Sequence, residues 1–206
     1  MARPPKTDEK RREIVRHAAK LFDSLGYEHV SMDQIAEAVG LRKPSLYHYV
    51  ANKHELLYLI NDQFLTQLIC WHEARLEAGL RPSELLLECM SDILALMHEH
   101  RGHAGVFFEY LQDLTPAQRQ EVEKLRNRYH RCVLEVVRQG VRQGEFRTPD
   151  PELTTLGLFG MCSWAYTWYR PQGRLTSREV AHHFWHLLMD GLRTPEPKTP
   201  SETTAS

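Results

Sequence analysis

Apolar residues recur at intervals of three and four positions along almost the whole chain, which is the spacing of one face of an α-helix. The alternating apolar and polar pattern of β-strands bounded by turns is missing. The pattern therefore predicts an all-α fold of about nine helices. Their expected ranges are about 8–25, 31–39, 43–50, 52–78, 82–100, 104–111, 116–143, 151–169 and 177–192.

Capping residues mark the ends of several of these helices. Ser31 with Gln34, and Thr115 with Gln118, have the spacing of a capping box at a helix start. Gly40 ends the second helix, and the third begins almost at once. Two short helices joined by a turn that contains glycine have the form of a helix-turn-helix.

The second helix of this unit carries side chains suited to a DNA surface. In a helix-turn-helix, the N-terminal residues of the second helix meet base edges, while hydroxyls and cations nearby hold phosphates. The residues of suitable chemistry are Arg42, Lys43, Ser45, Tyr47, His48, Tyr49 and Lys53. A helical hairpin with an ordinary polar surface has the same periodicity, so the spacing alone leaves both interpretations open.

Short segments at fixed spacing run through the first three predicted helices. They are AKLF at 19–22, GY at 26–27, VS at 30–31, SMDQIA at 31–36, VGL at 39–41, KPSLYHYV at 43–50 and NKHELL at 52–57. Together they resemble the DNA-binding domain of the TetR family of transcriptional regulators, over roughly the first 60 residues. Arg42 stands where that family often has a small capping residue, and Val50 where it often has Phe. Arg42 makes the DNA sequence that is read less predictable.

The resemblance implies a homodimer that binds a palindromic DNA operator through two reading helices. It places Lys43, Pro44, Ser45, Tyr47, His48, Tyr49 and Lys53 at DNA-facing positions, with Tyr47 and Lys53 as phosphate anchors. It also implies a helical C-terminal domain for dimerisation and for a small-molecule effector, which moves the long helix from Asn52 and so changes the spacing of the reading helices. Such a mechanism requires that ligand and DNA prefer different conformations. Repression with release by the ligand is the family default.

We accordingly expect three parts in the chain: a helix-turn-helix DNA-binding domain over residues 1–52, a ligand-binding and dimerisation domain over 53–193, and a disordered tail over 194–206. The last two predicted helices are rich in apolar residues and are the expected dimer surface. Filling of the monomer core explains part of the same pattern.

Aromatic and flexible apolar residues concentrate on the C-terminal helices. The candidate pocket residues are Phe64, Leu68, Trp71, Leu94, Met97, Phe107, Phe108, Tyr110, Trp164 and Trp168. Core packing explains each of them singly, and only their concentration favours a cavity.

One segment suggests a class of effector. Residues 164–173, with WYRP at 168–171 before a glycine, resemble TetR regulators that sense acyl-CoA thioesters. Arginines that could meet CoA phosphates are Arg119, Arg126, Arg128 and Arg131. Their alternation with Glu121 and Glu123 is also typical of a solvated charged face.

Composition changes this picture little. The 206 residues carry 26 Lys and Arg against 27 Asp and Glu, so the net charge is −1, although the first 60 residues carry a net charge of +2. Near neutrality bounds nonspecific affinity for DNA and says little about specific binding by a dimer. The four cysteines lie in apolar helical patterns and suggest reduced thiols. A polar N-terminus and short apolar runs lead us to expect a cytoplasmic protein with no membrane partner.

Two histidine groups invite a metal interpretation: His98, His100 and His103, and His182 with His186. The first lacks the spacing of a zincin motif, and no carboxylate or cysteine completes the second, so we expect no metal site. No phosphate loop, nucleophile elbow or carboxylate pair is recognisable, so we expect neither catalytic residues nor a cofactor. An all-α enzyme and a helical adaptor without DNA binding remain the alternatives to a regulator.

Overall fold

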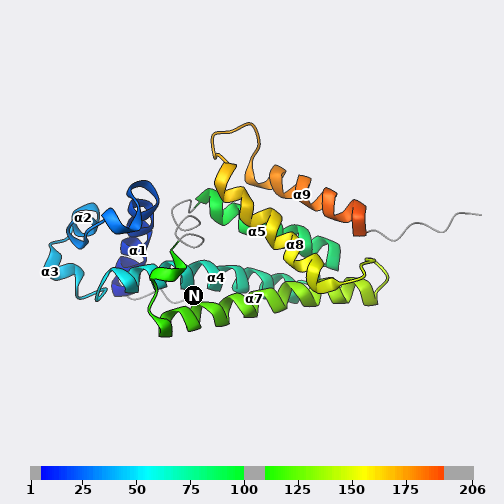
Figure 1. Cartoon of the computed structure of the whole chain (residues 1–206), viewed down its shortest axis with the longest axis horizontal. Coiled ribbons are helices and arrows are strands. Elements are labelled where there is room, and N and C mark those ends of the chain that lie inside the picture. The colour runs from blue at the N-terminus through cyan, green and yellow to red at the C-terminus, as the bar shows by residue number, and fades with distance from the viewer. Residues whose placement is uncertain (1–5, 100–109, 193–206) are drawn as a thin grey trace, which may run out of the picture.

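The computed structural model describes residues 6–99 and 110–192, and every element it describes is helical (Figure 1). This confirms the all-α prediction. The elements are α1 Lys6–Leu25, η1 Tyr27–His29, α2 Met32–Ala38, α3 Lys43–Leu46, α4 Lys53–Glu77, α5 Pro82–Glu99, η2 Leu111–Asp113, α7 Pro116–Arg142, α8 Pro151–Trp168 and α9 Ser177–Leu192, where η denotes a short 3₁₀-helix. Most of the helix expected over 104–111, and the tail expected over 194–206, fall outside the described residues.

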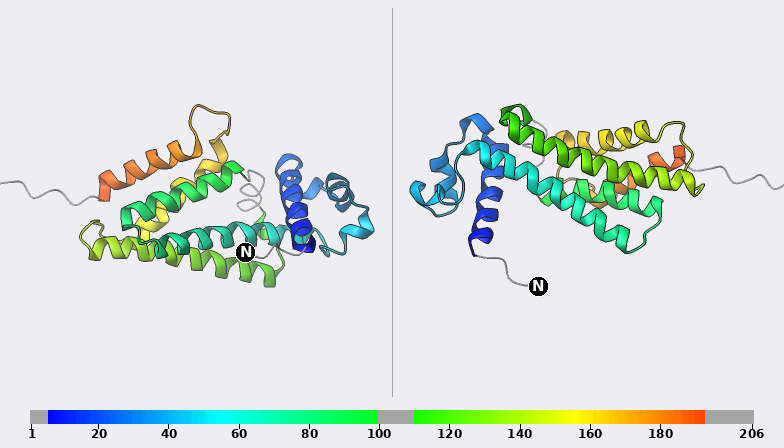
Figure 2. Two further views of the ribbon diagram at one scale, coloured as in Figure 1. Left: turned by 180° about the vertical axis from the view of Figure 1, so that it is seen from behind. Right: turned by 90° about the horizontal axis from the view of Figure 1, so that it is seen from below.

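The helices form a small N-terminal group and a larger body. Helices α1, α2 and α3 lie together at one end of the molecule, and α4 runs from them into the body (Figures 1 and 2). In the body α5 packs against α4, α7, α8 and α9, and α4 lies alongside α7. At about 1.5 Å per residue, α4 is long enough, at roughly 37 Å, to carry a displacement from the body to the N-terminal group.

The N-terminal group has its own apolar core. Ile14, Ala18 and Phe22 lie on one face of α1 and are fully buried. The ring of Phe22 meets Tyr27 edge to face, with 5.0 Å between the ring centroids. Gly26, with φ of 85°, makes the sharp turn that brings Tyr27 back onto α1, in a backbone region that favours glycine. This core holds α1 and η1 as one unit.

Helix α4 belongs to both parts because it is buried on several sides. Its N-cap is Asn52, whose side chain accepts a hydrogen bond from the backbone of Glu55. Leu56 and Ile60 are fully buried, and Phe64 and Leu68 continue the buried surface toward the body. It contacts α1, α5 and α7, and these contacts cover most of its apolar side chains.

The C-terminal end of α7 contains a glycine that packing requires. A Cβ atom added at Gly140 would lie 2.2 Å from a ring carbon of Phe146, well inside van der Waals contact. Phe146 is buried, and its backbone amide donates to the Gly140 carbonyl at 3.1 Å. The ring therefore lies directly against the helix backbone, and any side chain at this position would displace it.

Candidate DNA-binding surface and effector cavity

The turn between α2 and α3 has the predicted geometry. Ser31 and Gln34 form both hydrogen bonds of the capping box, the Ser31 amide donating to Gln34 Oε1 at 2.8 Å and the Gln34 amide donating to Ser31 Oγ at 3.3 Å. Gly40 has φ of 66°, a backbone region that favours glycine. The Leu41 amide then donates to the Ala36 carbonyl at 2.8 Å, which closes the end of α2. The turn fixes the direction in which α3 leaves α2.

Helix α3 is shorter than the predicted helix over 43–50. Its regular part is Lys43–Leu46, and the backbone then tightens, with the Tyr49 amide donating to the Leu46 carbonyl at 2.9 Å. Leu46 and Val50 are both buried, so the tight turn returns the chain to the core before Asn52 starts α4. The side chains between them are carried on a turn rather than on a regular helix.

The side chains predicted to face DNA form a mostly exposed polar surface at this end of the molecule. Arg42, Lys43, Pro44, Tyr47 and His48 are exposed, whereas Ser45, Tyr49 and Lys53 are partly buried. Arg42 occupies the N-cap of α3 without a side-chain capping bond, so α3 does not use its guanidinium. Tyr47 is 45% exposed although it is a large aromatic residue. An exposed phenol beside cations is suited to a phosphate backbone.

Lys43 is oriented by an exposed ion pair. Its ammonium lies 2.7 Å from Asp33 Oδ2 on α2. This hydrogen bond raises the pKa of Lys43, so the side chain stays charged. Exposed ion pairs contribute little to stability, and a phosphate can therefore replace Asp33 at small cost.

Lys53, expected as a phosphate anchor, already has protein partners. Its ammonium donates to the Tyr27 carbonyl at 2.7 Å and lies 3.4 Å from the Glu28 carbonyl. It also lies 4.3 Å from the centroid of the Tyr27 ring, a cation–π distance. Lys53 thus ties the first turn of α4 to η1, and an ammonium has three donors, so one is left for a phosphate.

His54, the next residue, connects this end of the molecule to the body. Its Nδ1 lies 2.9 Å from the Asp113 carbonyl and 3.0 Å from the Tyr27 hydroxyl. A carbonyl only accepts, so the bond to Asp113 requires the proton on Nδ1, and the Tyr27 oxygen then accepts as well. Burial, reinforced by the charges of Asp113 and Glu28, raises the pKa of Tyr27 to about 12. The start of α4 is therefore bonded to η2, the segment that leads into α7.

A cavity of about 370 Å³ lies in the body between α4, α5, α7 and α8. It is lined by Phe64, Leu65, Leu68, Ile93, Arg126, Asn127, Tyr129, His130, Leu156, Phe159 and Ser163. Its volume falls in the range of small-molecule sites, and its walls are mostly apolar.

The polar lining of this cavity comes largely from α7. Burial lowers the pKa of Arg126. His130 Nε2 lies 3.4 Å from Glu152 Oε1 without hydrogen-bond geometry. Arg126 and His130 are one turn apart on α7, so both face the same space. An apolar ligand with a polar or anionic end fits this arrangement.

The residues that the sequence suggested for a pocket lie in different parts of the molecule. Phe64 and Leu68 line the cavity, whereas Leu94 and Met97 are buried on α5 away from its lining. Trp71 packs against the core, Tyr110 stacks near Tyr27 at 5.6 Å, and Trp164 and Trp168 are 66% and 44% exposed on α8. Phe107 and Phe108 lie outside the described residues. The lining residues that the sequence did not suggest are Leu65, Ile93, Asn127, Tyr129, His130, Leu156, Phe159 and Ser163.

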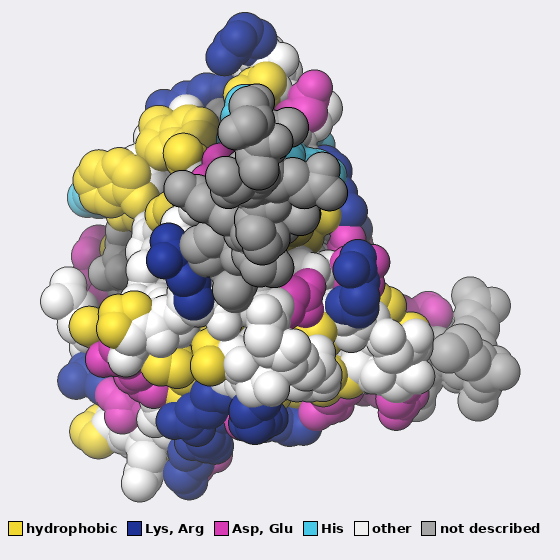
Figure 3. Space-filling model, turned by 90° about the vertical axis from the view of Figure 1, so that its right-hand side faces the viewer, with side chains coloured by type: hydrophobic (Ala, Val, Ile, Leu, Met, Phe, Trp, Pro, Cys, Tyr) yellow, Lys and Arg dark blue, Asp and Glu magenta, His cyan; other side chains and the backbone are white. Residues whose placement is uncertain are grey.

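The tryptophans belong to an exposed stripe along α8. The stripe consists of Leu153, Leu156, Gly157, Gly160, Trp164 and Trp168, and all six are exposed. A Cβ atom at Gly157 or Gly160 would meet nothing within 4 Å, so packing within the described chain gives no reason for these helical glycines. On the neighbouring helix α9, Leu187 is 69% exposed. Hydrophobic side chains also reach the surface at the end of the molecule where α9 finishes (Figure 3).

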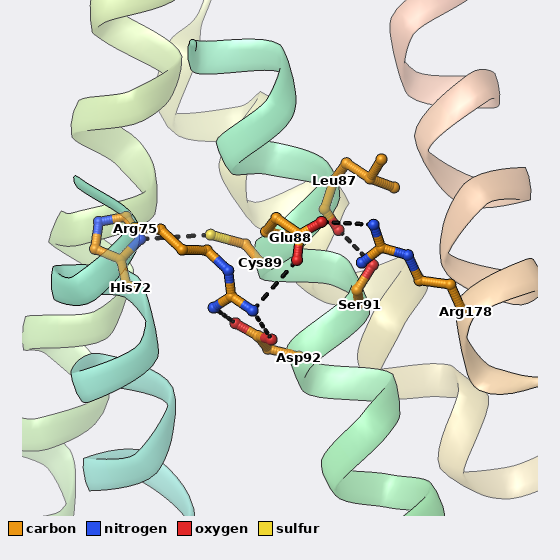
Figure 4. Close-up of polar contacts among 8 residues, drawn as sticks. All are labelled: His72, Arg75, Leu87, Glu88, Cys89, Ser91, Asp92 and Arg178. Atoms are coloured by element: carbon orange, nitrogen blue, oxygen red, sulfur yellow. Dashed lines mark hydrogen bonds and ion pairs between the residues drawn. The ribbon is translucent and has the colours of Figure 1, made fainter. Parts of the chain in front are cut away.

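A chain of charged side chains joins α4, α5 and α9 (Figure 4). Arg75 donates two hydrogen bonds to Asp92, at 2.5 and 2.8 Å. Glu88 accepts from Arg178 at 2.6 Å and lies 3.2 Å from Arg75. Burial outweighs the attraction of Arg75 and raises the pKa of Asp92 to about 6. These ion pairs link α4, which begins at the DNA-binding end, through α5 to α9, the helix that carries the exposed Leu187.

Comparison with known proteins identifies the class. Residues 14–58 match the family model "Bacterial regulatory proteins, tetR family", and residues 79–192 match "Tetracyclin repressor-like, C-terminal domain". The chain belongs to the TetR family of transcriptional regulators. Its N-terminal match is to the regulatory-protein model of that family, so the chain is a DNA-binding transcriptional regulator.

Individual relatives agree with this assignment over most of the chain. The transcriptional repressor KstR2 of Mycobacterium tuberculosis is 26% identical over 186 residues, 89% of this chain and 92% of its own. The TetR family regulator PfmR from Thermus thermophilus superposes with a TM-score of 0.81 at 33% identity, over 88% of this chain and 99% of its own. AibR, in a crystal structure with isovaleryl coenzyme A and operator DNA, gives a TM-score of 0.78 at 28% identity, over 88% of this chain and 99% of its own.

The described residues carry neither a membrane-spanning helix nor a metal-binding cluster. No helix within 6–99 and 110–192 combines the length and apolarity needed to cross a membrane. Within the same ranges, no three His, Cys, Asp or Glu side chains are grouped so that they could hold a metal ion. His182 and His186 are both exposed on α9, and His100 and His103 lie outside the described residues.

Proposed function

We propose that this regulator is a repressor that binds a palindromic operator as a homodimer, through the α3 surface of each subunit, and releases the DNA when the CoA thioester of a small acyl group occupies the cavity. The observation that carries the effector is the mostly apolar cavity of about 370 Å³ with Arg126 and His130 on its wall.

The proposed reading surface consists of Arg42, Lys43, Pro44, Ser45, Tyr47, His48, Tyr49 and Lys53. Support comes from the exposure of five of these side chains around the start and end of α3. Tyr47 and the third donor of Lys53 would hold phosphates, and Arg42 and His48 would contact base edges. We keep the division into domains at residues 52 and 53 as part of the proposal, although α4 shares its core with both parts.

The apolar stripe of α8 and Leu187 on α9 support the homodimer. An exposed row of leucine and tryptophan is unusual on a monomer and typical of an interface. Glycines at the centre of such a row allow a partner helix to approach closely. A four-helix bundle of α8 and α9 from two subunits would cover both surfaces and place the two α3 helices on one side of the dimer.

The effector class is supported by the lining of the cavity and by one relative. AibR is similar to 88% of this chain and was crystallised with isovaleryl coenzyme A and operator DNA. In the present chain Leu68, Ile93 and Phe159 offer an apolar chamber for a short acyl group. Arg126 and His130 offer hydrogen-bond donors for the thioester carbonyl or for a polar group beyond it.

Release of operator DNA tests this proposal. Fluorescence anisotropy of a labelled DNA from the region upstream of the gene would be followed while isovaleryl-CoA, free CoA or isovalerate is added. We expect release by the thioester and little by either part alone. A panel of acyl-CoA esters that neither releases DNA nor shifts the thermal midpoint of the protein would refute the effector class.

A filled cavity is the matched variant. Ser163→Phe adds a ring inside the cavity, and Thr167→Phe adds the same ring one turn further along α8, outside the lining. We expect only Ser163→Phe to raise the thioester concentration that is needed for release. Equal behaviour of the two variants would place the effector elsewhere.

A further inference from the structure

Phe64 also lines a second cavity, between the DNA-binding end and the body. This cavity has a volume of about 420 Å³ and is formed by α1, α4 and α5. Its lining residues are Arg12, Arg16, Asp62, Gln63, Phe64, Thr66, Gln67, Cys70 and Leu96. Unlike the first cavity, it is lined mostly by charged and polar side chains, so it suits a different chemistry.

Its cations come from α1. Arg12 and Arg16 are one turn apart and therefore project from the same face of that helix, which crosses α4 (Figure 2). Within residues 6–99 and 110–192, neither forms an ion pair with a carboxylate, and Arg12 Nε has only a long contact of 3.4 Å with the Asp8 carbonyl. Two guanidinium groups beside a cavity that pair with no carboxylate of the described residues are suited to bidentate binding of phosphate oxygens.

The opposite wall is one polar face of α4. Gln63 and Gln67 lie one turn apart and carry amides that both donate and accept hydrogen bonds. Asp62, half-buried, only accepts when it is ionised, so it favours a ligand with amino groups. Against two arginines, one carboxylate leaves the cavity with a net positive charge. Phosphates at one end and an exocyclic amine with ring nitrogens at the other are the features of an adenine nucleotide.

We infer that this second cavity binds an adenine nucleotide, with its phosphates on Arg12 and Arg16 and its base against Asp62, Gln63 and Gln67. If the effector is a CoA thioester, which rests on the proposed function, the nucleotide is the one that forms part of CoA. Phe64, which lines both cavities, would then lie between the acyl end and the nucleotide end of the bound CoA thioester. A free nucleotide has the same chemistry and is the other source.

This site would link the ligand directly to the DNA-binding end. Helix α1 belongs to the N-terminal group, whereas Leu96 of α5 belongs to the body. A nucleotide that contacts both α1 and α5 restrains the orientation of the N-terminal group relative to the body. It changes operator affinity by the factor by which its own affinity differs between the DNA-bound and the DNA-free conformation.

Cysteine footprinting on the full-length protein tests the site without relying on DNA release. Cys70 is exposed and lines the cavity, while Cys132 is partly buried in a separate groove between α4 and α7. Burial raises the pKa of the Cys89 thiol to about 12, so that thiol reacts slowly at neutral pH. Alkylation of each cysteine would be timed by mass spectrometry with no ligand, with 3′,5′-ADP, or with isovaleryl-CoA.

We expect both ligands to slow alkylation of Cys70 and to leave the Cys132 rate unchanged. Protection by isovaleryl-CoA at much lower concentration than by 3′,5′-ADP would identify the nucleotide as part of the effector, and equal potency would identify a separate nucleotide site. No saturable protection of Cys70 by either ligand at millimolar concentration would overturn the inference, even if isovaleryl-CoA still releases DNA.

Charge removal gives the second arm. The double variant Arg12→Gln/Arg16→Gln should lose about tenfold or more in affinity for 3′,5′-ADP, since two charge-assisted contacts are removed. The control Lys20→Gln/Arg138→Gln removes two exposed cations that line neither cavity and should bind 3′,5′-ADP as the wild type does. Unchanged nucleotide affinity of the first variant would contradict the site. The site would also be contradicted if the only effect of Arg12→Gln/Arg16→Gln were a loss of operator binding without ligand. That result would show that the two arginines contact DNA phosphates.

Discussion

Replacing Leu187 by alanine removes an apolar side chain that is 69% exposed at the surface of α9. Fully burying a leucine contributes about 1.5–3 kcal/mol, so burying the exposed part of Leu187 in a dimer contributes about 1–2 kcal/mol per subunit. A two-fold interface contains the residue twice, which makes about 2–4 kcal/mol per dimer. The dimer dissociation constant should therefore rise by a factor of about 30 to 1,000.

Sedimentation equilibrium over a range of protein concentrations measures this constant. The matched control is Leu76→Ala, which removes the same atoms from a leucine that is 45% exposed on α4, away from α8 and α9. The control should dimerise as the wild type does. If Leu187→Ala and Leu76→Ala give the same dissociation constant as the wild type, or if the wild type is a monomer at all concentrations, the assignment of the α8 and α9 surface is wrong.

Two further substitutions test the packing that supports the site, both by chemical denaturation. Gly140→Ala should lower the free energy of unfolding by about 1–3 kcal/mol because its Cβ would overlap the Phe146 ring; in a Phe146→Ala background the same change should do no harm, and equal losses in both backgrounds would contradict the packing argument. Arg75→Met should lower the free energy of unfolding by about 3 kcal/mol because it leaves the Asp92 carboxylate buried without its partner. The control Arg128→Met breaks an exposed ion pair and should cost less than about 1 kcal/mol, so a similar loss in the two variants would show that burial does not decide the effect.

Much of the fold follows from periodicity and capping. The boxes at Ser31 and Thr115 start α2 and α7 where the sequence predicts, because capping is a local interaction. The end of α3 was predicted too late. The buried position of Val50 forces a tight turn, and that requirement comes from packing against the core rather than from local propensity.

The site was harder to predict because the type of a residue does not determine whether its side chain faces a cavity or the solvent. Arg126 and Arg128 are similar in sequence context, yet Arg126 lines the cavity between α4, α5, α7 and α8, whereas Arg128 pairs with Glu73 on the surface at 2.5 Å. Phe64 and Trp164 were both suggested for a pocket. Phe64 is buried at the cavity wall, and Trp164 is 66% exposed.

Lys53 shows the same limit for polar residues. Its position in the motif suggests a phosphate anchor, while the structure gives it two carbonyls and a ring on η1. Contacts across 26 residues of chain cannot be read from local spacing. Arg12 and Arg16 are four residues apart in the sequence, but whether they share a cavity with Asp62 depends on how α1 crosses α4.

Affinity for the DNA upstream of the gene, measured by anisotropy at two salt concentrations, tests the central claim most directly. The wild type should bind that DNA more tightly than a scrambled duplex of equal length, with an affinity that falls as salt rises. Tyr47→Ala/His48→Ala should weaken specific binding by about tenfold or more, since it removes a phosphate contact and a base-edge contact. The control His182→Ala, on exposed α9, should leave it unchanged. Equal binding of the scrambled duplex, or full specific binding by Tyr47→Ala/His48→Ala, would contradict the assignment of α3 as the reading surface.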